Sequence, residues 1–136
     1  MNERPINQGS ENIVGTYSET FENAPVIKTL YGNVSLASDI GYRKERNEDR
    51  VFIDTNANLF GVVDGIGGYE RGDEAAEIVC QQVLSGIKNG VDPRMIQNSA
   101  SLAIRQKGIL IGGACYLYFQ VVKKNYTLVG QETSDL

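Results

Sequence analysis

The sequence contains no histidine, and this absence narrows the possible chemistry more than any other feature of its composition. Without histidine the chain cannot form a Ser-His-Asp triad, a Cys-His nucleophile pair or a zinc site with imidazole ligands. A metal ion bound by this chain would have to be held by oxygen atoms. Mg²⁺ and Mn²⁺ are the ions that such ligands suit best.

Cysteine and long apolar runs are also scarce. The two cysteines, Cys80 and Cys115, lie among apolar neighbours and are expected to be reduced core thiols in a cytoplasmic protein. No apolar run approaches the roughly 18 residues of a membrane helix, and nothing resembles a secretory signal. With 13 basic and 17 acidic side chains the net charge is -4. This charge argues against nucleic acid or an anionic membrane as a partner, because lysine and arginine bind phosphate backbones.

The composition changes near residue 30. Residues 1–30 are polar and irregular, and they are expected to form a flexible leader with one short strand at 13–17. Residues 31–136 are expected to form a single domain, which suits the length of the chain. At its start, alternating side chains predict a half-buried strand. The residues of this alternation are Val34, Leu36, Ser38 and Ile40.

Two hairpins are predicted from apolar segments that flank turn-forming residues. Residues 50–54 and 59–64 flank the sequence Thr-Asn-Ala-Asn, and residues 115–122 and 126–130 flank Lys-Lys-Asn. Two separate hairpins would form short sheets with unpaired edges. Such edges pair readily with other strands, so self-association through the sheet edges is expected.

Two helices are predicted between the hairpins. The first spans about 73–88 and ends at Asn89. Its apolar residues lie three and four apart, at Ala76, Val79, Cys80, Val83, Leu84 and Ile87. The second follows the N-cap residue Asp92 and ends at Lys107. Strands followed by helices and then strands predict an α+β fold, with antiparallel β-sheets and helices packed on the outside. The predicted apolar face of the second helix consists of Met95, Ile96, Ser99, Leu102 and Ala103.

Acidic residues gather at the ends of the first predicted hairpin. Glu48 and Asp49 precede its first strand, and Asp64 ends its second strand. If the strands pair through the turn, the three carboxylates meet, and a divalent cation would offset their repulsion. Gly65 has no side chain, so its carbonyl could approach the same ion. On spacing alone, a solvated acidic loop followed by an ordinary glycine turn explains the same residues.

At these residues the sequence resembles the PPM-type (type 2C) metal-dependent serine/threonine protein phosphatases. The segment SDIGYRKERNEDRVFID is similar to the first motif of the family, and LFGVVDGIGGYERGDEAAEIV is similar to the second. The later segment GGACYLYFQVVKKNYTLVGQ resembles the next pair of strands, so the likeness covers about 34–131. The resemblance implies an incomplete version of the α-β-β-α sandwich of that family. It also implies hydrolysis of phosphoserine and phosphothreonine in a phosphorylated protein partner.

The resemblance further implies specific roles. The family uses two Mg²⁺ or Mn²⁺ ions, and a water acidified between them attacks phosphorus. Asp64 would bridge both ions and Asp49 would bind a metal or orient its water, so these two residues are the catalytic candidates. Glu48 and the Gly65 carbonyl would complete the metal ligands.

The substrate phosphate would be held by a basic residue, for which Arg43 and Lys44 both remain candidates. Tyr69 stands where some members have a histidine, so the resemblance does not extend to a histidine proton donor at this position. No residue matches two later metal-binding aspartates of the family. The chain is therefore expected to be a truncated phosphatase domain that holds one ion or none. The alternatives are a catalytically inactive remnant that acts as a binding or regulatory module, and a purely structural acidic domain.

Overall fold

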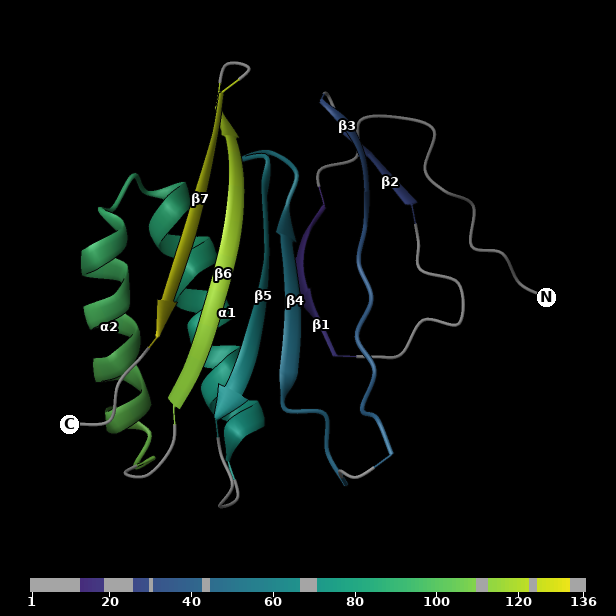
Figure 1. Cartoon of the computed structure of the whole chain (residues 1–136). Helices are drawn as coiled ribbons and strands as arrows, with labels where there is room; N and C mark the ends of the chain where they lie inside the picture. The colour runs from purple at the N-terminus through teal and green to yellow at the C-terminus, as the bar shows by residue number, and fades with distance from the viewer. Residues whose placement is uncertain are drawn as a thin grey trace.

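The computed structural model describes residues 13–18, 26–29, 31–42, 45–66, 71–109, 113–122 and 125–132. In these residues the fold is α+β, with two sheets of antiparallel strands and two helices (Figure 1). The strands are β1 (Val14–Tyr17), β2 (Val26–Thr29), β3 (Gly32–Ser35), β4 (Asp49–Asp54), β5 (Leu59–Ile66), β6 (Gly113–Val122) and β7 (Asn125–Glu132). The helices are α1 (Gly72–Lys88) and α2 (Pro93–Gln106).

Both predicted hairpins are confirmed, but they do not form separate sheets. β4 pairs with β5 and β6 pairs with β7, and β5 and β6 are also neighbours. The result is one five-stranded sheet in the order β1-β4-β5-β6-β7. The expectation of two short sheets was wrong because β5 pairs with β6, and α1 and α2 separate these strands in the sequence. Local sequence patterns carry no information about such a contact.

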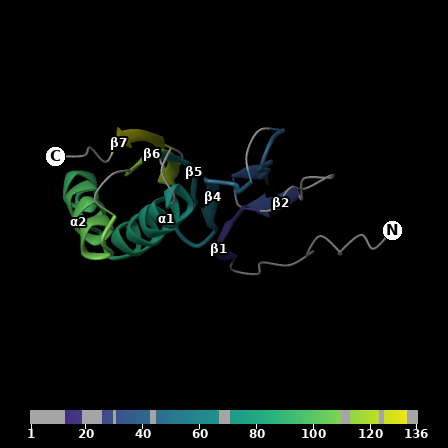
Figure 2. The same ribbon diagram turned by 90° about the horizontal axis from the view of Figure 1, so that it is seen from below.

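The main core lies between this sheet and the helices, which both cover the same face (Figure 2). The predicted apolar face of α1 is confirmed, since Ala76, Val79 and Val83 are fully buried and Ile87 packs against the core. Asp73 and Glu74 in the first turn and Lys88 in the last turn complement the helix dipole. This burial holds α1 along β4 and β5.

The buried face of α2 agrees with the prediction at Ile96 and differs from it elsewhere. Ile96, Ala100 and Ile104 are buried, whereas Met95 and Leu102 are 61% and 54% exposed. The N-cap was predicted correctly, because the Asp92 side chain accepts a hydrogen bond from the Arg94 amide. The buried side chains follow a spacing of four residues, with a small alanine in the middle. Ile96 lies over Gly86 of α1, where a Cβ atom would come within 2.5 Å of its Cγ1 atom. This close approach of α1 and α2 determines which face of α2 is buried.

The described residues cover the other face of the sheet only in part. β2 and β3 pair with each other and lie beside the β1 end of the sheet, as Figure 1 shows. A second cluster of Leu36, Val51 and Ile53 is buried there. Over β5, β6 and β7 the same face keeps apolar side chains partly exposed. These are Val62, Ile66, Leu117, Phe119 and Leu128.

The segment around residues 34–40 is strand only up to Ser35. The predicted alternation persists beyond the strand, because Leu36 and Ser38 are buried, but it fails at Ile40, which is 37% exposed. Two strands lie within the predicted leader. The short strand at 13–17 is confirmed as β1, which pairs with β4, and β2 pairs with β3.

Neither helix in the described ranges combines the length and hydrophobicity needed to cross a membrane. The two cysteines lie on different faces of the sheet. Cys80, a residue of α1, is buried in the core between α1 and the sheet, as expected, and burial raises the pKa of its thiol to about 12. Cys115 is only half-buried and is the β6 partner of Asp64.

Candidate metal site

The β4–β5 turn determines which residues face each other at the other end of the hairpin. The buried Asp54 carboxylate accepts hydrogen bonds from the Asn56 and Ala57 amides at 2.9 and 3.2 Å. Asn58 adopts a φ of 48°, which asparagine tolerates better than most residues. From this turn the pairing runs in register to the far end of the hairpin. There Asp49 lies directly opposite Asp64.

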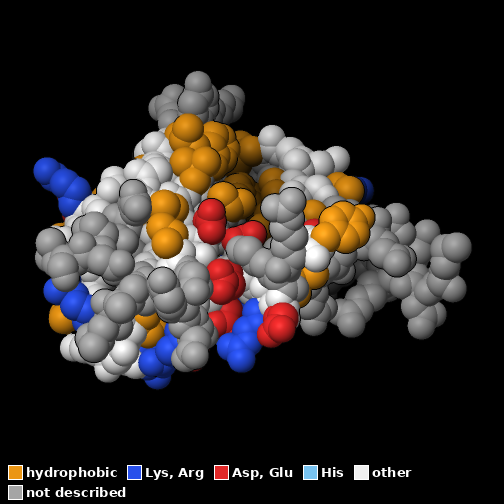
Figure 3. Space-filling view, turned by 60° about the horizontal axis from the view of Figure 1, so that its bottom comes forward, with side chains coloured by type: hydrophobic (Ala, Val, Ile, Leu, Met, Phe, Trp, Pro, Cys, Tyr) orange, Lys and Arg blue, Asp and Glu red, His pale blue; other side chains and the backbone are white. Residues whose placement is uncertain are grey.

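The two aspartates are on the face of the sheet away from the helices. Directly opposite residues in an antiparallel pair have Cβ atoms roughly 4.5–5.5 Å apart, and like charges at this distance are destabilising. Asp49 is half-buried and Asp64 is exposed. Figure 3 brings this end of the sheet forward and shows acidic side chains gathered beside hydrophobic ones, with basic side chains next to them. The arrangement concentrates negative charge where a cation can reach it.

Glu48 reaches the same place through its backbone. Its carbonyl accepts a hydrogen bond of 3.2 Å from the Gly65 amide. Gly65 is enclosed by backbone atoms, since a Cβ atom there would lie 2.6 Å from the Glu48 oxygen and closer still to the Gly72 oxygen. The absence of a side chain at Gly65 therefore allows β5, the Glu48 segment and the start of α1 to meet.

Of the residues predicted to form the site, Glu48, Asp49, Asp64 and Gly65 lie at one end of the β4–β5 hairpin. Arg43 and Lys44 lie outside the described residues. Within the described ranges, no group of three or more acidic or cysteine side chains forms a preformed metal-binding cluster.

The donor set fits a hard divalent cation. Mg²⁺ and Mn²⁺ prefer carboxylate, carbonyl and water oxygens. The structure places two carboxylates opposite each other, and the repulsion between them is what a bound dication would remove. Asp49 and Asp64 are therefore the central pair of the candidate site, with the Glu48 carbonyl beside Gly65.

Sequence reasoning missed the residues that hold the Glu48–Asp49 segment in place. Asn47 donates to the Ser18 carbonyl at 2.9 Å and to the Ser38 hydroxyl at 2.8 Å, and its side-chain oxygen accepts from the Asp49 amide at 3.0 Å. Arg50 projects to the opposite face from Asp49 and contacts this segment from the helix side. The available signal was the alternation along β4, which places Arg50 towards α1.

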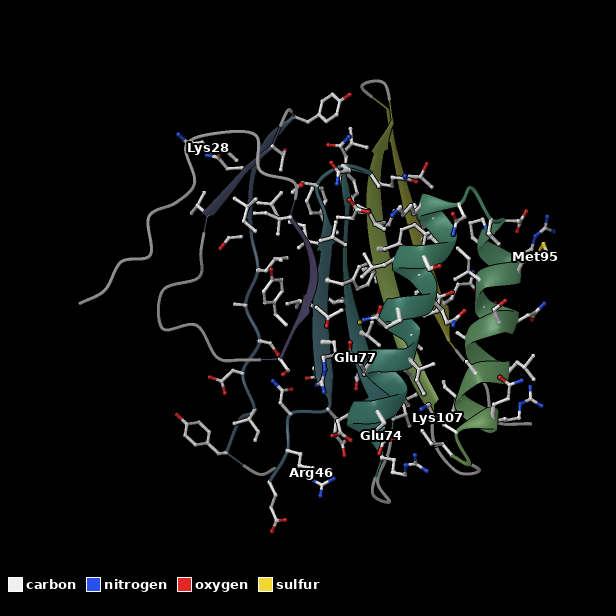
Figure 4. The ribbon with its side chains drawn as sticks, turned by 180° about the vertical axis from the view of Figure 1, so that it is seen from behind. Lys28, Arg46, Glu74, Glu77, Met95 and Lys107 are labelled. Atoms are coloured by element: carbon white, nitrogen blue, oxygen red, sulfur yellow. The ribbon has the colours of Figure 1, made fainter. Side chains whose placement is uncertain are left out.

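Charged side chains also surround the start of α1. Arg71 donates two hydrogen bonds to the Glu74 carboxylate, at 3.1 and 2.7 Å, and a third to the Lys107 carbonyl. The hydrogen bond from Arg71 lowers the pKa of Glu74, with smaller contributions from the positive charges of Lys107 and Arg46. Figure 4 shows Arg46 and Glu74 at the same end of the molecule. Arg46 is a described basic side chain, and it stands two residues before Glu48 in the sequence.

Comparison of the chain with family models, with curated proteins and with solved structures found no match. The likeness to PPM-type phosphatases therefore rests on the two sequence motifs, and these comparisons neither support nor oppose it.

Proposed function

We propose that this chain provides the metal-binding part of a metal-dependent phosphoserine/phosphothreonine protein phosphatase, with Mg²⁺ or Mn²⁺ held at Asp49 and Asp64. The observation that carries this proposal is the cross-strand pairing of these two aspartates next to the Glu48–Gly65 backbone contact. The order and spacing of the two phosphatase-like motifs give the reaction class. The partner would be a protein that carries phosphoserine or phosphothreonine.

Each residue has a separate task in this proposal. Asp64, at the end of β5, would be a ligand of the ion, and Asp49, on β4, would bind a metal or orient its water. Glu48 and the Gly65 carbonyl supply further oxygen ligands. A bound Mg²⁺ or Mn²⁺ would act as a Lewis acid towards the phosphate and would acidify the attacking water. Arg43 and Lys44 remain the candidates for holding the substrate phosphate.

Charge determines how many ions these residues can hold. Glu48, Asp49 and Asp64 supply three negative charges, which can offset one dication. A second ion at about 3.5–4 Å would add strong repulsion and would need further carboxylates. We expect the chain to bind one ion and to hydrolyse phosphoesters slowly by itself.

The test combines calorimetric titration with Mn²⁺ and an assay with phosphopeptide and p-nitrophenyl phosphate. Asp64→Asn should abolish Mn²⁺ binding because it removes one of the two carboxylates at the centre of the site. The matched control is Asp92→Asn, which makes the same charge change at the exposed α2 N-cap, where asparagine caps equally well. Absence of Mn²⁺ binding by the parent chain would refute the proposal. Binding without turnover would instead support a metal-binding module that is not an enzyme.

The free energy of unfolding provides a second test. Asp64→Asn should be more stable than the parent without Mn²⁺ and less stable than the parent with Mn²⁺. Without metal, Asp64→Asn should stabilise the chain by about 0.2–1 kcal/mol, because it removes a like-charge cross-strand pair. At a Mn²⁺ concentration 100 times the dissociation constant, the parent should gain about 2.7 kcal/mol and the variant should gain nothing. Thermal melting with and without Mn²⁺ measures both effects. An equal response of the parent and Asp64→Asn to Mn²⁺ would place the ion elsewhere.

A further inference from the structure

The side chain of Arg50 is largely buried although it carries a permanent charge. Its side chain is 13% exposed and lies on the helix-facing side of β4. A buried guanidinium needs hydrogen-bond partners for its donors, because the loss of hydration is otherwise costly. The partners of Arg50 therefore show what this residue does in the fold.

Two of these partners are backbone carbonyls that bracket Glu48. The Nη1 atom of Arg50 donates to the Asn47 oxygen at 2.8 Å and to the Asp49 oxygen at 2.9 Å. The Glu48 carbonyl between them accepts from the Gly65 amide. The carbonyls of three consecutive residues are thus held by hydrogen bonds. These bonds fix the backbone at Glu48 and Asp49, and with it the directions in which the two side chains leave the backbone.

The third partner ties this contact to α1. The Nε atom of Arg50 donates to the Glu77 carboxylate at 3.3 Å. Glu77 also accepts from the Thr16 hydroxyl at 3.0 Å and from the Gln81 side chain at 2.9 Å. Figure 4 shows Glu77 projecting from α1 towards the sheet. Through Glu77, the position of Arg50 depends on both α1 and β1.

We infer that Arg50, held by Glu77, is a positioning residue that orients the Glu48–Asp49 segment for metal binding without contacting the metal. The metal part of this inference rests on the proposed function. An arginine suits the task because its planar fork serves a carboxylate and two carbonyls at once. The ammonium group of lysine is a point charge on a flexible stem and lacks this fork.

Charge and positioning predict opposite effects on metal affinity. Removing a positive charge near a cation site strengthens cation binding by electrostatics alone. Releasing the Glu48–Asp49 segment weakens binding, and loss of an outer-shell contact typically costs 10–100-fold in metal affinity. The sign of the change in Mn²⁺ affinity therefore separates the two roles of Arg50.

The experiment compares Arg50→Met and Arg50→Lys with the parent chain, using calorimetric titration with Mn²⁺ and thermal melting to confirm folding. Both variants should bind Mn²⁺ at least about tenfold more weakly, including Arg50→Lys, which keeps the charge. The matched control is Arg94→Met, which breaks the exposed Arg94–Asp92 ion pair at α2 with the same charge change. It should bind Mn²⁺ like the parent.

A readout without metal separates this inference from the proposed function. The Gly65 amide, which donates to the Glu48 carbonyl, should exchange with solvent at least about tenfold faster in Arg50→Met than in Arg94→Met. If the parent binds no Mn²⁺, the proposed function fails, and faster exchange still supports the positioning of the segment. Unchanged exchange, or Mn²⁺ binding as tight as in the parent, would overturn the role of Arg50.

Discussion

Replacing Gly65 by alanine tests the close backbone contact at the candidate site. The new Cβ atom would lie 2.6 Å from the Glu48 oxygen and closer to the Gly72 oxygen, whereas real Cβ contacts are essentially never below 3.0 Å. Gly65 is not among the described glycines with positive φ, so the penalty is steric and not conformational. Both clashing atoms belong to the backbone, and no side-chain rotation can relieve them.

The expected cost follows from this geometry. Forcing extra atoms into a well-packed site costs about 1–3 kcal/mol, and the rigid partners here place Gly65→Ala at about 2–3 kcal/mol. For a chain of this length we expect a fall in Tm of roughly 6–15 °C. Urea unfolding should show a lower midpoint with an unchanged slope.

Gly130→Ala is the matched control in another strand of the same sheet. Its Cβ atom would meet mainly the Cδ1 atom of Leu117, at 3.2 Å, which can move by rotation of the leucine side chain. We expect a change within about 1 kcal/mol, because alanine also reduces the entropy of the unfolded chain. If Gly65→Ala melts as high as Gly130→Ala, the close contact of Glu48, Gly65 and Gly72 is not present in solution.

Three further predictions concern the core, alkaline pH and the sheet edge. The buried Tyr116 hydroxyl has no hydrogen-bond partner in the described part of the chain, so Tyr116→Phe should leave urea stability unchanged or raise it by about 1 kcal/mol; a clear loss would reveal a partner. Burial raises the pKa of the Cys80 thiol from 9.0 to about 12, so this thiol loses its proton at lower pH in the unfolded chain than in the folded chain. The free energy of unfolding should therefore fall above pH 9 by up to about 1.4 kcal/mol per pH unit. Cys80→Ala should flatten this fall in urea titrations at pH 8–11, and an equal slope would exclude the thiol as its cause. Leu128, 62% exposed on the edge strand β7, is expected to promote self-association, which Leu128→Lys should reduce in sedimentation at rising concentration; a parent that stays monomeric would contradict this.

Local sequence patterns predicted the parts of the fold that depend on neighbouring residues. The spacing of Ala76, Val79 and Val83 located α1 and its buried face, and the Asp92 cap located the start of α2. The pairing of β5 with β6 could not be predicted, because α1 and α2 separate them in the sequence. Apart from Ile96, the buried face of α2 also escaped prediction, since it depends on how closely α2 approaches Gly86 of α1.

The candidate site likewise has contacts that local sequence predicts and contacts that depend on another element of the fold. The facing of Asp49 and Asp64 follows from a four-residue turn and strict alternation, so the sequence predicted it and the structure confirms the pairing. The contacts of Arg50 with Glu77 and with the Asn47 carbonyl could not be predicted, because they require the position of α1 over β4. Residues that support a site from another element leave no periodic signal of their own.

The fixed pairing of β4 with β5 limits how the length of this hairpin can change. A one-residue insertion or deletion carried along β4 would exchange its two faces, turning Asp49 towards the helices and Arg50 towards the open side. A shift by two residues would keep the faces but would place Val62 or Ile66 opposite Asp49. The spacing from Asp49 to Asp64 is therefore more tightly constrained than the identity of the apolar side chains between them.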